Sequence, residues 1–139
     1  MVNTIYEGRM TSKDYLEDDL VKLWKEDNIL FSEYKSEILD LEAAKNTVKS
    51  RLQFTDNKTY PVVIDITNIR TVTKEARDYL SRGEAISHLS AAAIIANSLA
   101  TRLLFNFFLT FSKPALPMRI FNSKDEAIKW IGQFAAQQN

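Results

Sequence analysis

The sequence contains no cysteine, and its 139 residues hold only three glycines, three prolines and one histidine. Without cysteine the chain forms no disulfide, thiolate metal site or iron–sulfur cluster, and it has no cysteine nucleophile. The single histidine, His88, excludes a histidine metal cluster. We therefore expect no metal and no cofactor. The lack of cysteine also fits a reducing, cytoplasmic compartment.

Glycine-rich loops and basic clusters are lacking as well. The three glycines, Gly8, Gly83 and Gly132, are scattered, so the chain has neither a Walker A loop nor a dinucleotide-binding fingerprint. Lysine and arginine together number 18, as do aspartate and glutamate, and no basic cluster is interleaved with aromatic residues. We expect no nucleic-acid partner. No complete catalytic constellation is present, so we expect a protein that is not an enzyme.

Long hydrophobic runs are also lacking. The apolar segment 103–111 is interrupted by Asn106 and is far shorter than the roughly 20 residues that cross a bilayer. The first residues do not show the basic stretch and apolar core of a signal peptide. We expect no transmembrane segment and no secretion.

The hydrophobic pattern that is present predicts one α/β domain. Residues 1–18 have no clear period and form an N-terminal arm of uncertain structure, whereas residues 19–139 form the domain. Two apolar stretches, 20–25 and 29–34, flank the polar turn at residues 26–28, which predicts a β-hairpin.

Further along the chain, helical and strand patterns alternate. Asp40, Thr73 and Ser123 are each suited to N-cap a helix, and residues 62–66 read as a buried central strand. The predicted elements after the hairpin are a helix at 41–52, a strand at 62–66, a helix from 74, a strand at 91–96, a helix at 98–111, a strand at 118–121 and a helix at 124–134. The order is β-β-α-β-α-β-α-β-α. Right-handed crossovers would make the later strands parallel within a mixed sheet.

Two segments within this order resemble those of a known family. Residues 62–67 (VVIDIT) are similar to an apolar strand that ends in an acidic residue, and residues 121–131 (FNSKDEAIKWI) to a final strand-to-helix segment. Over residues 19–135 the chain resembles the STAS domain, the fold of bacterial anti-sigma-factor antagonists, and more closely the uncharacterised bacterial STAS-like proteins. The resemblance implies a regulatory module that binds a protein through the loop after the third strand and the adjoining helix.

The chain departs from that family at the site of phosphorylation. The family's antagonists carry an Asp-Ser-Ser-Gly type motif after the third strand, where this chain has Thr73-Lys74-Glu75-Ala76. Glu75 stands nearest to the acceptor serine, so the surface could be permanently charged, or Thr71 or Thr73 could take the phosphate. The alternative that we favour is that Thr73 and Glu75 simply cap a helix. The candidate partner-binding residues are Asp65, Thr67, Thr71, Thr73, Lys74 and Glu75.

Two further residues, Phe105 and Leu109, fall outside the core stripe of the helix predicted at 98–111. Extra core packing is the favoured interpretation, and a homodimer contact or contact with an apolar ligand are the alternatives. The sequence therefore leaves two classes of function. The first, which the sequence favours, is a non-enzymatic module that binds a regulatory protein or a second copy of the chain. The second is a binder of a small apolar or lipid-like ligand, as the similarity of some STAS-like proteins to lipid-carrier folds implies.

Overall fold

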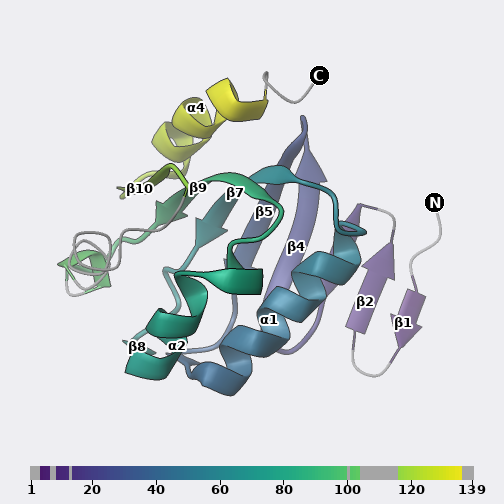
Figure 1. Ribbon diagram of the computed structural model, residues 1–139, viewed down its shortest axis with the longest axis horizontal. Coiled ribbons are helices and arrows are strands. Elements are labelled where there is room, and N and C mark those ends of the chain that lie inside the picture. The colour runs from purple at the N-terminus through teal and green to yellow at the C-terminus, as the bar shows by residue number, and fades with distance from the viewer. Residues whose placement is uncertain (1–3, 7–8, 13, 100, 104–115, 136–139) are drawn as a thin grey trace.

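The computed structural model describes residues 4–6, 9–12, 14–99, 101–103 and 116–135. These residues form an eight-stranded mixed sheet in the order β1-β2-β3-β4-β5-β7-β9-β10, with α1 and α2 on one face and α4 on the other (Figure 1). The strands of this sheet are β1 Thr4–Tyr6, β2 Arg9–Ser12, β3 Tyr15–Glu17, β4 Val21–Glu26, β5 Ile29–Tyr34, β7 Tyr60–Asp65, β9 Leu89–Ile95 and β10 Met118–Phe121. The helices are α1 Leu41–Phe54, α2 Lys74–Leu80, the short 3₁₀ helix η1 Gly83–Ala85, and α4 Lys124–Ala135.

The predicted hairpin is confirmed. β4 pairs antiparallel with β5, from Val21 opposite Tyr34 to Glu26 opposite Ile29. Asp27 and Asn28 join the strands with φ of 53° and 64°. A two-residue turn with two positive φ values matches the right-handed twist of the strands, and Asp and Asn tolerate that conformation better than most residues.

The N-terminal segment, whose structure the sequence left uncertain, extends the sheet. β1, β2 and β3 follow one another as antiparallel strands, and β3 pairs with β4 so that Tyr15 lies opposite Trp24. Leu16 of β3 is buried with Val21 and Leu23 of β4.

The other half of the sheet is parallel, as the predicted crossovers require. β7 pairs parallel with both β5 and β9, and β9 pairs parallel with β10. The mixed α/β architecture predicted from the sequence is therefore confirmed. Leu99 and residues 101–103 are helical, and the Ser98 hydroxyl before them accepts a hydrogen bond from the Thr101 amide at 3.4 Å. The rest of the helix predicted at 98–111, residues 100 and 104–111, lies outside the described residues.

Three helices begin at the predicted caps. The Asp40 side chain accepts a hydrogen bond from the Ala43 amide at 2.8 Å, and that of Thr73 accepts one from the Ala76 amide at 3.2 Å. The Ser123 hydroxyl accepts one from the Glu126 amide at 3.3 Å. Each bond satisfies an amide in the first turn that has no partner within its helix.

The loop predicted between β7 and α2 contains a strand that the sequence analysis missed. β8 Thr71–Val72 pairs parallel with β6 Ile38–Leu39 in a separate two-stranded sheet. The Thr73 amide also donates to the Leu39 carbonyl at 3.0 Å. Two-residue strands are too short to show a hydrophobic period, so the pairing had no signal in the sequence. It joins the segment before α1 to the segment before α2.

Alternate residues of the central strands face opposite helical layers. In β9, Ala91 and Ala93 pack with Ala127 and Ile131 of α4. Ala92 points the other way, toward the layer of α1, and is fully buried with its neighbours on β5 and β7. The alternation follows from the two-residue period of a strand.

Candidate functional site

The polar residues after β7 hold the turn at the end of that strand. The Asp65 carboxylate accepts a hydrogen bond from the Thr67 amide at 2.9 Å, and the Asn68 side-chain amide donates to the Tyr34 carbonyl at 3.1 Å. Asp65 and Thr67 are half-buried. The interaction shown for Asp65 is thus with its own turn, and it accounts for an acidic residue at the end of this strand.

The remaining predicted partner-binding residues lie nearby. Thr71 is exposed on β8, and Thr73 is half-buried because its hydroxyl caps α2. Lys74 forms an ion pair with Asp78 one turn later, with Nζ 3.1 Å from Oδ2. Glu75 is exposed in the first turn of α2. The structure brings Thr71, Thr73, Lys74 and Glu75 onto one short segment, and it gives Thr73 the capping role that the sequence analysis favoured.

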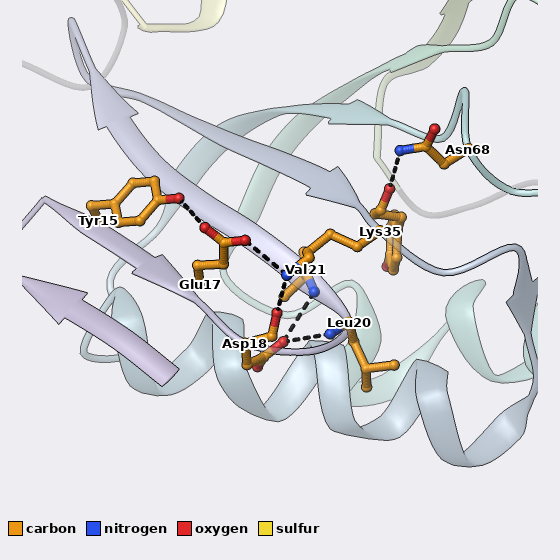
Figure 2. A network of polar contacts seen from close by, with 8 residues as sticks. Tyr15, Glu17, Asp18, Leu20, Val21, Lys35 and Asn68 are labelled. Atoms are coloured by element: carbon orange, nitrogen blue, oxygen red, sulfur yellow. Dashed lines mark hydrogen bonds and ion pairs between the residues drawn. The ribbon is translucent and has the colours of Figure 1, made fainter. Parts of the chain in front are cut away.

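A polar network joins β3 to the end of β5, next to the bond between Asn68 and the Tyr34 carbonyl (Figure 2). The Lys35 ammonium lies 2.7 Å from the Glu17 carboxylate and 2.8 Å from the Asp18 carbonyl, and the Tyr15 hydroxyl donates to Glu17 at 2.6 Å. The hydrogen bonds from Lys35 and Tyr15 lower the pKa of Glu17, and the bond to Glu17 raises the pKa of Tyr15 to about 12. Figure 2 also shows Asp18 turned back on its own chain, where its carboxylate accepts from the Leu20 and Val21 amides. The contacts of Lys35 with Glu17 and Asp18 fasten β3 to the end of β5, and the local bonds of Tyr15, Leu20 and Val21 hold Glu17 and Asp18 in position.

A cavity lies between the sheet and the layer formed by α1, α2 and η1. It offers about 80 Å³ of space for the centres of water-sized molecules. Its lining is mostly apolar, and it includes side chains from β5, β7, β9 and β10 of the sheet. The described lining residues are Ser32, Tyr34, Leu39, Thr47, Val48, Arg51, Val62, Ile64, Ile66, Leu80, Ala85, Ile86, Leu89, Ala92, Ile94 and Met118.

The hydroxyl groups of Tyr34 and Thr47 form a hydrogen bond in the lining of the cavity. The Tyr34 hydroxyl lies 3.3 Å from Thr47 Oγ1, and Thr47 donates to the Ala44 carbonyl at 3.0 Å. With the single Thr47 proton directed at Ala44, Tyr34 is the donor of the pair, and its oxygen can still accept a hydrogen bond. Burial raises the pKa of Tyr34, against the opposing effects of Thr47 and of the charge on Arg51. Tyr34 therefore remains neutral at ordinary pH.

Arg51 is the charged residue of the lining and is only 7% exposed. Its guanidinium donates to three backbone carbonyls: Nη1 to Ser87 at 2.9 Å, and Nη2 to Ala85 at 2.9 Å and to Glu84 at 3.4 Å. Among the described residues it forms no ion pair with a carboxylate. Burial lowers the pKa of Arg51, although arginine remains charged over the whole physiological range.

The sequence analysis missed this cavity, yet one signal for it was present. Thr47 and Arg51 are one helical turn apart and interrupt the apolar stripe that includes Ala44 and Val48 of α1. Polar residues on the buried stripe of a helix require partners or a ligand. The other predicted contact residues, Phe105 and Leu109, lie outside the described residues.

Within the part of the chain that the structure describes, no group of three or more His, Cys, Asp and Glu side chains is arranged to hold a metal ion. The helices of that part are all too short or too polar to cross a membrane.

Comparison with known protein families shows which domain family the chain belongs to. The family model of a domain of unknown function, DUF7793, matches residues 23–135. The chain belongs to the DUF7793 family. The match to DUF7793 takes in every element from β5 to α4, and thus all of the described residues that line the cavity. No curated protein matches the chain.

One solved structure supports the fold of this DUF7793 domain. An uncharacterised DUF3478-family protein from Shewanella loihica PV-4, with a SpoIIAA-like fold, is similar with a TM-score of 0.56 and 18% identity, covering 80% of this chain and 91% of that one. A protein of unknown function from Arthrobacter sp. FB24 matches at 20% identity over 79% of this chain and 97% of its own, with a TM-score of only 0.31. The Shewanella structure confirms the STAS-like fold predicted from the sequence.

Proposed function

We propose that this domain is a non-enzymatic binding module that takes a small, largely apolar molecule into the cavity between α1 and the sheet. The observation that carries the proposal is the cavity itself, lined by side chains such as Val62, Ile64 and Ala92, with hydroxyl groups at Tyr34 and Thr47. Ligand pockets typically combine an apolar lining with a few polar groups that fix orientation. The lack of cysteine supports a reducing, cytoplasmic setting for this activity.

The size of the cavity limits the ligand. An apolar cavity of about 150 Å³ holds one benzene ring, so the 80 Å³ here encloses roughly three or four carbon atoms of a ligand. The cavity is partly open, so a chain of about six carbons places about half of its length inside and extends through the open side. The proposed ligand is smaller than the lipid-like molecules considered from the sequence.

Titration with hexan-1-ol, followed in ¹⁵N–¹H correlation spectra, tests the proposal. Saturable shifts are expected for amides of β7, β9 and α1. Ala92→Ile directs extra carbon atoms into the cavity and should abolish the shifts. Lys49→Ala, at an exposed position on α1, is the matched control and should preserve them. Absence of saturable shifts in the wild-type protein would reject the proposal.

A second candidate function is protein binding at the segment after β7, and one specific observation favours it. Ile38 is 59% exposed and lies opposite Thr71 in the β6–β8 pair. Arg70 and Glu37 form an exposed ion pair beside it, with Nε 3.3 Å from Oε1. An exposed aliphatic side chain among polar neighbours is a common centre of a protein contact.

Native mass spectrometry of the protein isolated from its own host distinguishes the two candidates. A stoichiometric protein complex that is lost in Ile38→Asp and retained in Lys49→Glu would support the segment after β7 as the binding surface. The same spectra report the added mass of a phosphate group, and its absence under all growth conditions would reject a phosphorylation switch at Thr71 or Thr73. A small-molecule adduct on an otherwise free chain would support the cavity instead.

A further inference from the structure

Arg51 carries a positive charge whose burial the fold compensates only in part. Its three acceptors, the carbonyls of Glu84, Ala85 and Ser87, are neutral, and they lie at η1 and the turn that follows it. These bonds explain where the guanidinium lies and how the end of η1 is satisfied. They do not neutralise the charge, and burying a charge without a counter-charge is costly.

The guanidinium also keeps unused donors. It has five N–H groups, and the three hydrogen bonds to carbonyls leave two without a partner among the described residues. The Glu84 carboxylate forms no ion pair with Arg51 among the described residues, and it accepts instead from the Tyr79 hydroxyl at 2.6 Å. The charge therefore has capacity for an anion.

The side chains around Arg51 favour an anion that has an apolar tail. Arg51 lies one turn after Thr47 on α1, and Tyr34 lies against Thr47 from β5, so the polar groups form one cluster on the lining. The rest of the lining is aliphatic, with Leu80, Ile86 and Met118 among its members. One end of a bound molecule would thus meet a positive charge and hydroxyl groups, and the other end only carbon.

We propose that Arg51 is the anion-binding group of the cavity and that the ligand is a small aliphatic monocarboxylate. This inference rests on the proposed function, because it adds the charge of the ligand to the site described there. Guanidinium and carboxylate match in geometry as well as in charge, and the hydrogen bonds between them are stronger than those between neutral groups. The carboxylate supplies the counter-charge that the described residues do not provide to Arg51.

Three probes with the same alkyl chain test the inference on the wild-type protein at neutral pH, where no folding defect can intervene. They are hexanoate, hexan-1-ol and hexylammonium, each titrated in ¹⁵N–¹H correlation spectra. Hexanoate is expected to bind about tenfold or more tighter than hexan-1-ol, and hexylammonium more weakly than either. Equal binding of hexanoate and hexan-1-ol, or preference for hexylammonium, would overturn the inference and leave the apolar cavity intact. Failure of all three to bind would reject the proposed function as well.

Variants at Arg51 test whether this side chain causes the preference for hexanoate over hexan-1-ol. Arg51→Gln should reduce hexanoate binding to the level of hexan-1-ol while hexan-1-ol binding is retained. Arg51→Lys keeps the charge and should retain part of the preference. If Arg51→Gln folds and still prefers hexanoate by the wild-type factor, the assignment to Arg51 is wrong. If that variant does not fold, the order of the three probes on the wild-type protein decides the charge preference, and Arg51→Lys tests whether the preference depends on this side chain.

Discussion

The hydroxyl oxygens of Tyr34 on β5 and Thr47 on α1 lie 3.3 Å apart, so one buried hydrogen bond joins the sheet to the helical layer beside the cavity. Both side chains are buried, at 8% and 5% exposure. The Thr47 hydroxyl has a second partner, the Ala44 carbonyl, whereas the partner shown for the Tyr34 hydroxyl is Thr47. Loss of the bond therefore leaves Thr47 with a partner but leaves the Tyr34 hydroxyl with none among the described residues.

This inequality predicts which substitution is more costly. Tyr34→Phe removes the bond but leaves Thr47 bonded to Ala44, so the free energy of unfolding should fall by about 1 kcal/mol. Thr47→Val leaves a buried Tyr34 hydroxyl without its partner and should cost about 1–3 kcal/mol. Urea denaturation of both single variants and the double variant measures the coupling. A Thr47→Val variant more stable than Tyr34→Phe would contradict the inference that Thr47 is the partner on which the Tyr34 hydroxyl depends.

Replacing Ala92 or Ala93 of β9 by isoleucine should change the free energy of unfolding in different ways. Ala92 and Ala93 are both fully buried, but Ala92 lines the cavity and Ala93 packs against α4. Ala92→Ile has space to occupy and should leave the free energy of unfolding unchanged or raise it by about 1 kcal/mol. Ala93→Ile overpacks a filled layer and should lower it by about 1–3 kcal/mol. Equal losses in denaturant midpoints would show that no usable space lies beside Ala92.

The tyrosines predict a loss of stability at alkaline pH. The hydrogen bond to Glu17 raises the pKa of Tyr15 to about 12, and burial, with a hydrogen bond to Glu84, raises that of Tyr79 to about 12. Well below pH 10 both tyrosine hydroxyls are protonated in the folded and in the unfolded chain, and the stability that their interactions contribute is fully present. As pH rises from about 10 toward 12 the unfolded chain loses these protons first, so the free energy of unfolding falls.

Carbon NMR of ring-labelled tyrosine resolves these titrations individually. Glu17→Gln should move the pKa of Tyr15 toward the ordinary value, and the titration of Tyr79 in the same sample is the internal control. A Tyr15 that titrates near 10 in the wild-type protein would contradict the hydrogen bond between Tyr15 and Glu17.

Thr73 should behave as a helix cap. Its hydroxyl accepts from the Ala76 amide, so Thr73→Ala should destabilise the protein by about 1 kcal/mol, while Thr73→Ser keeps the hydroxyl and should cost only a few tenths. Thermal or urea unfolding of the pair gives the comparison. Equal losses from Ala and Ser would show that Thr73 matters for something other than the cap.

The sequence predicted the fold where the signal was local. The hairpin at Asp27–Asn28, the caps at Asp40 and Thr73, and the alternation of strands and helices all depend on residues close together in the chain. The β6–β8 pair and the strands of the N-terminal segment were not anticipated, because they are short and depend on partners elsewhere in the fold.

The candidate site was harder to predict for the same reason. The hydroxyl groups of the segment after β7 led to its prediction as a binding site. In the structure, Asp65 at the end of β7 stabilises a turn and Thr73 caps α2. The cavity brings together Tyr34, Arg51 and Ala92 from β5, α1 and β9, and no spacing in the sequence reports that arrangement. Only Thr47 and Arg51, two polar residues on the buried apolar stripe of α1, gave an indication of it.

A crystal structure determined under xenon pressure tests the central claim most directly, because xenon enters dry apolar cavities without needing polar contacts. The account predicts a xenon atom among Val62, Ile64 and Ala92, and none in Ala92→Ile. A filled core with no xenon there, or an ordered chain of water molecules in its place, would contradict an apolar ligand cavity between α1 and the sheet.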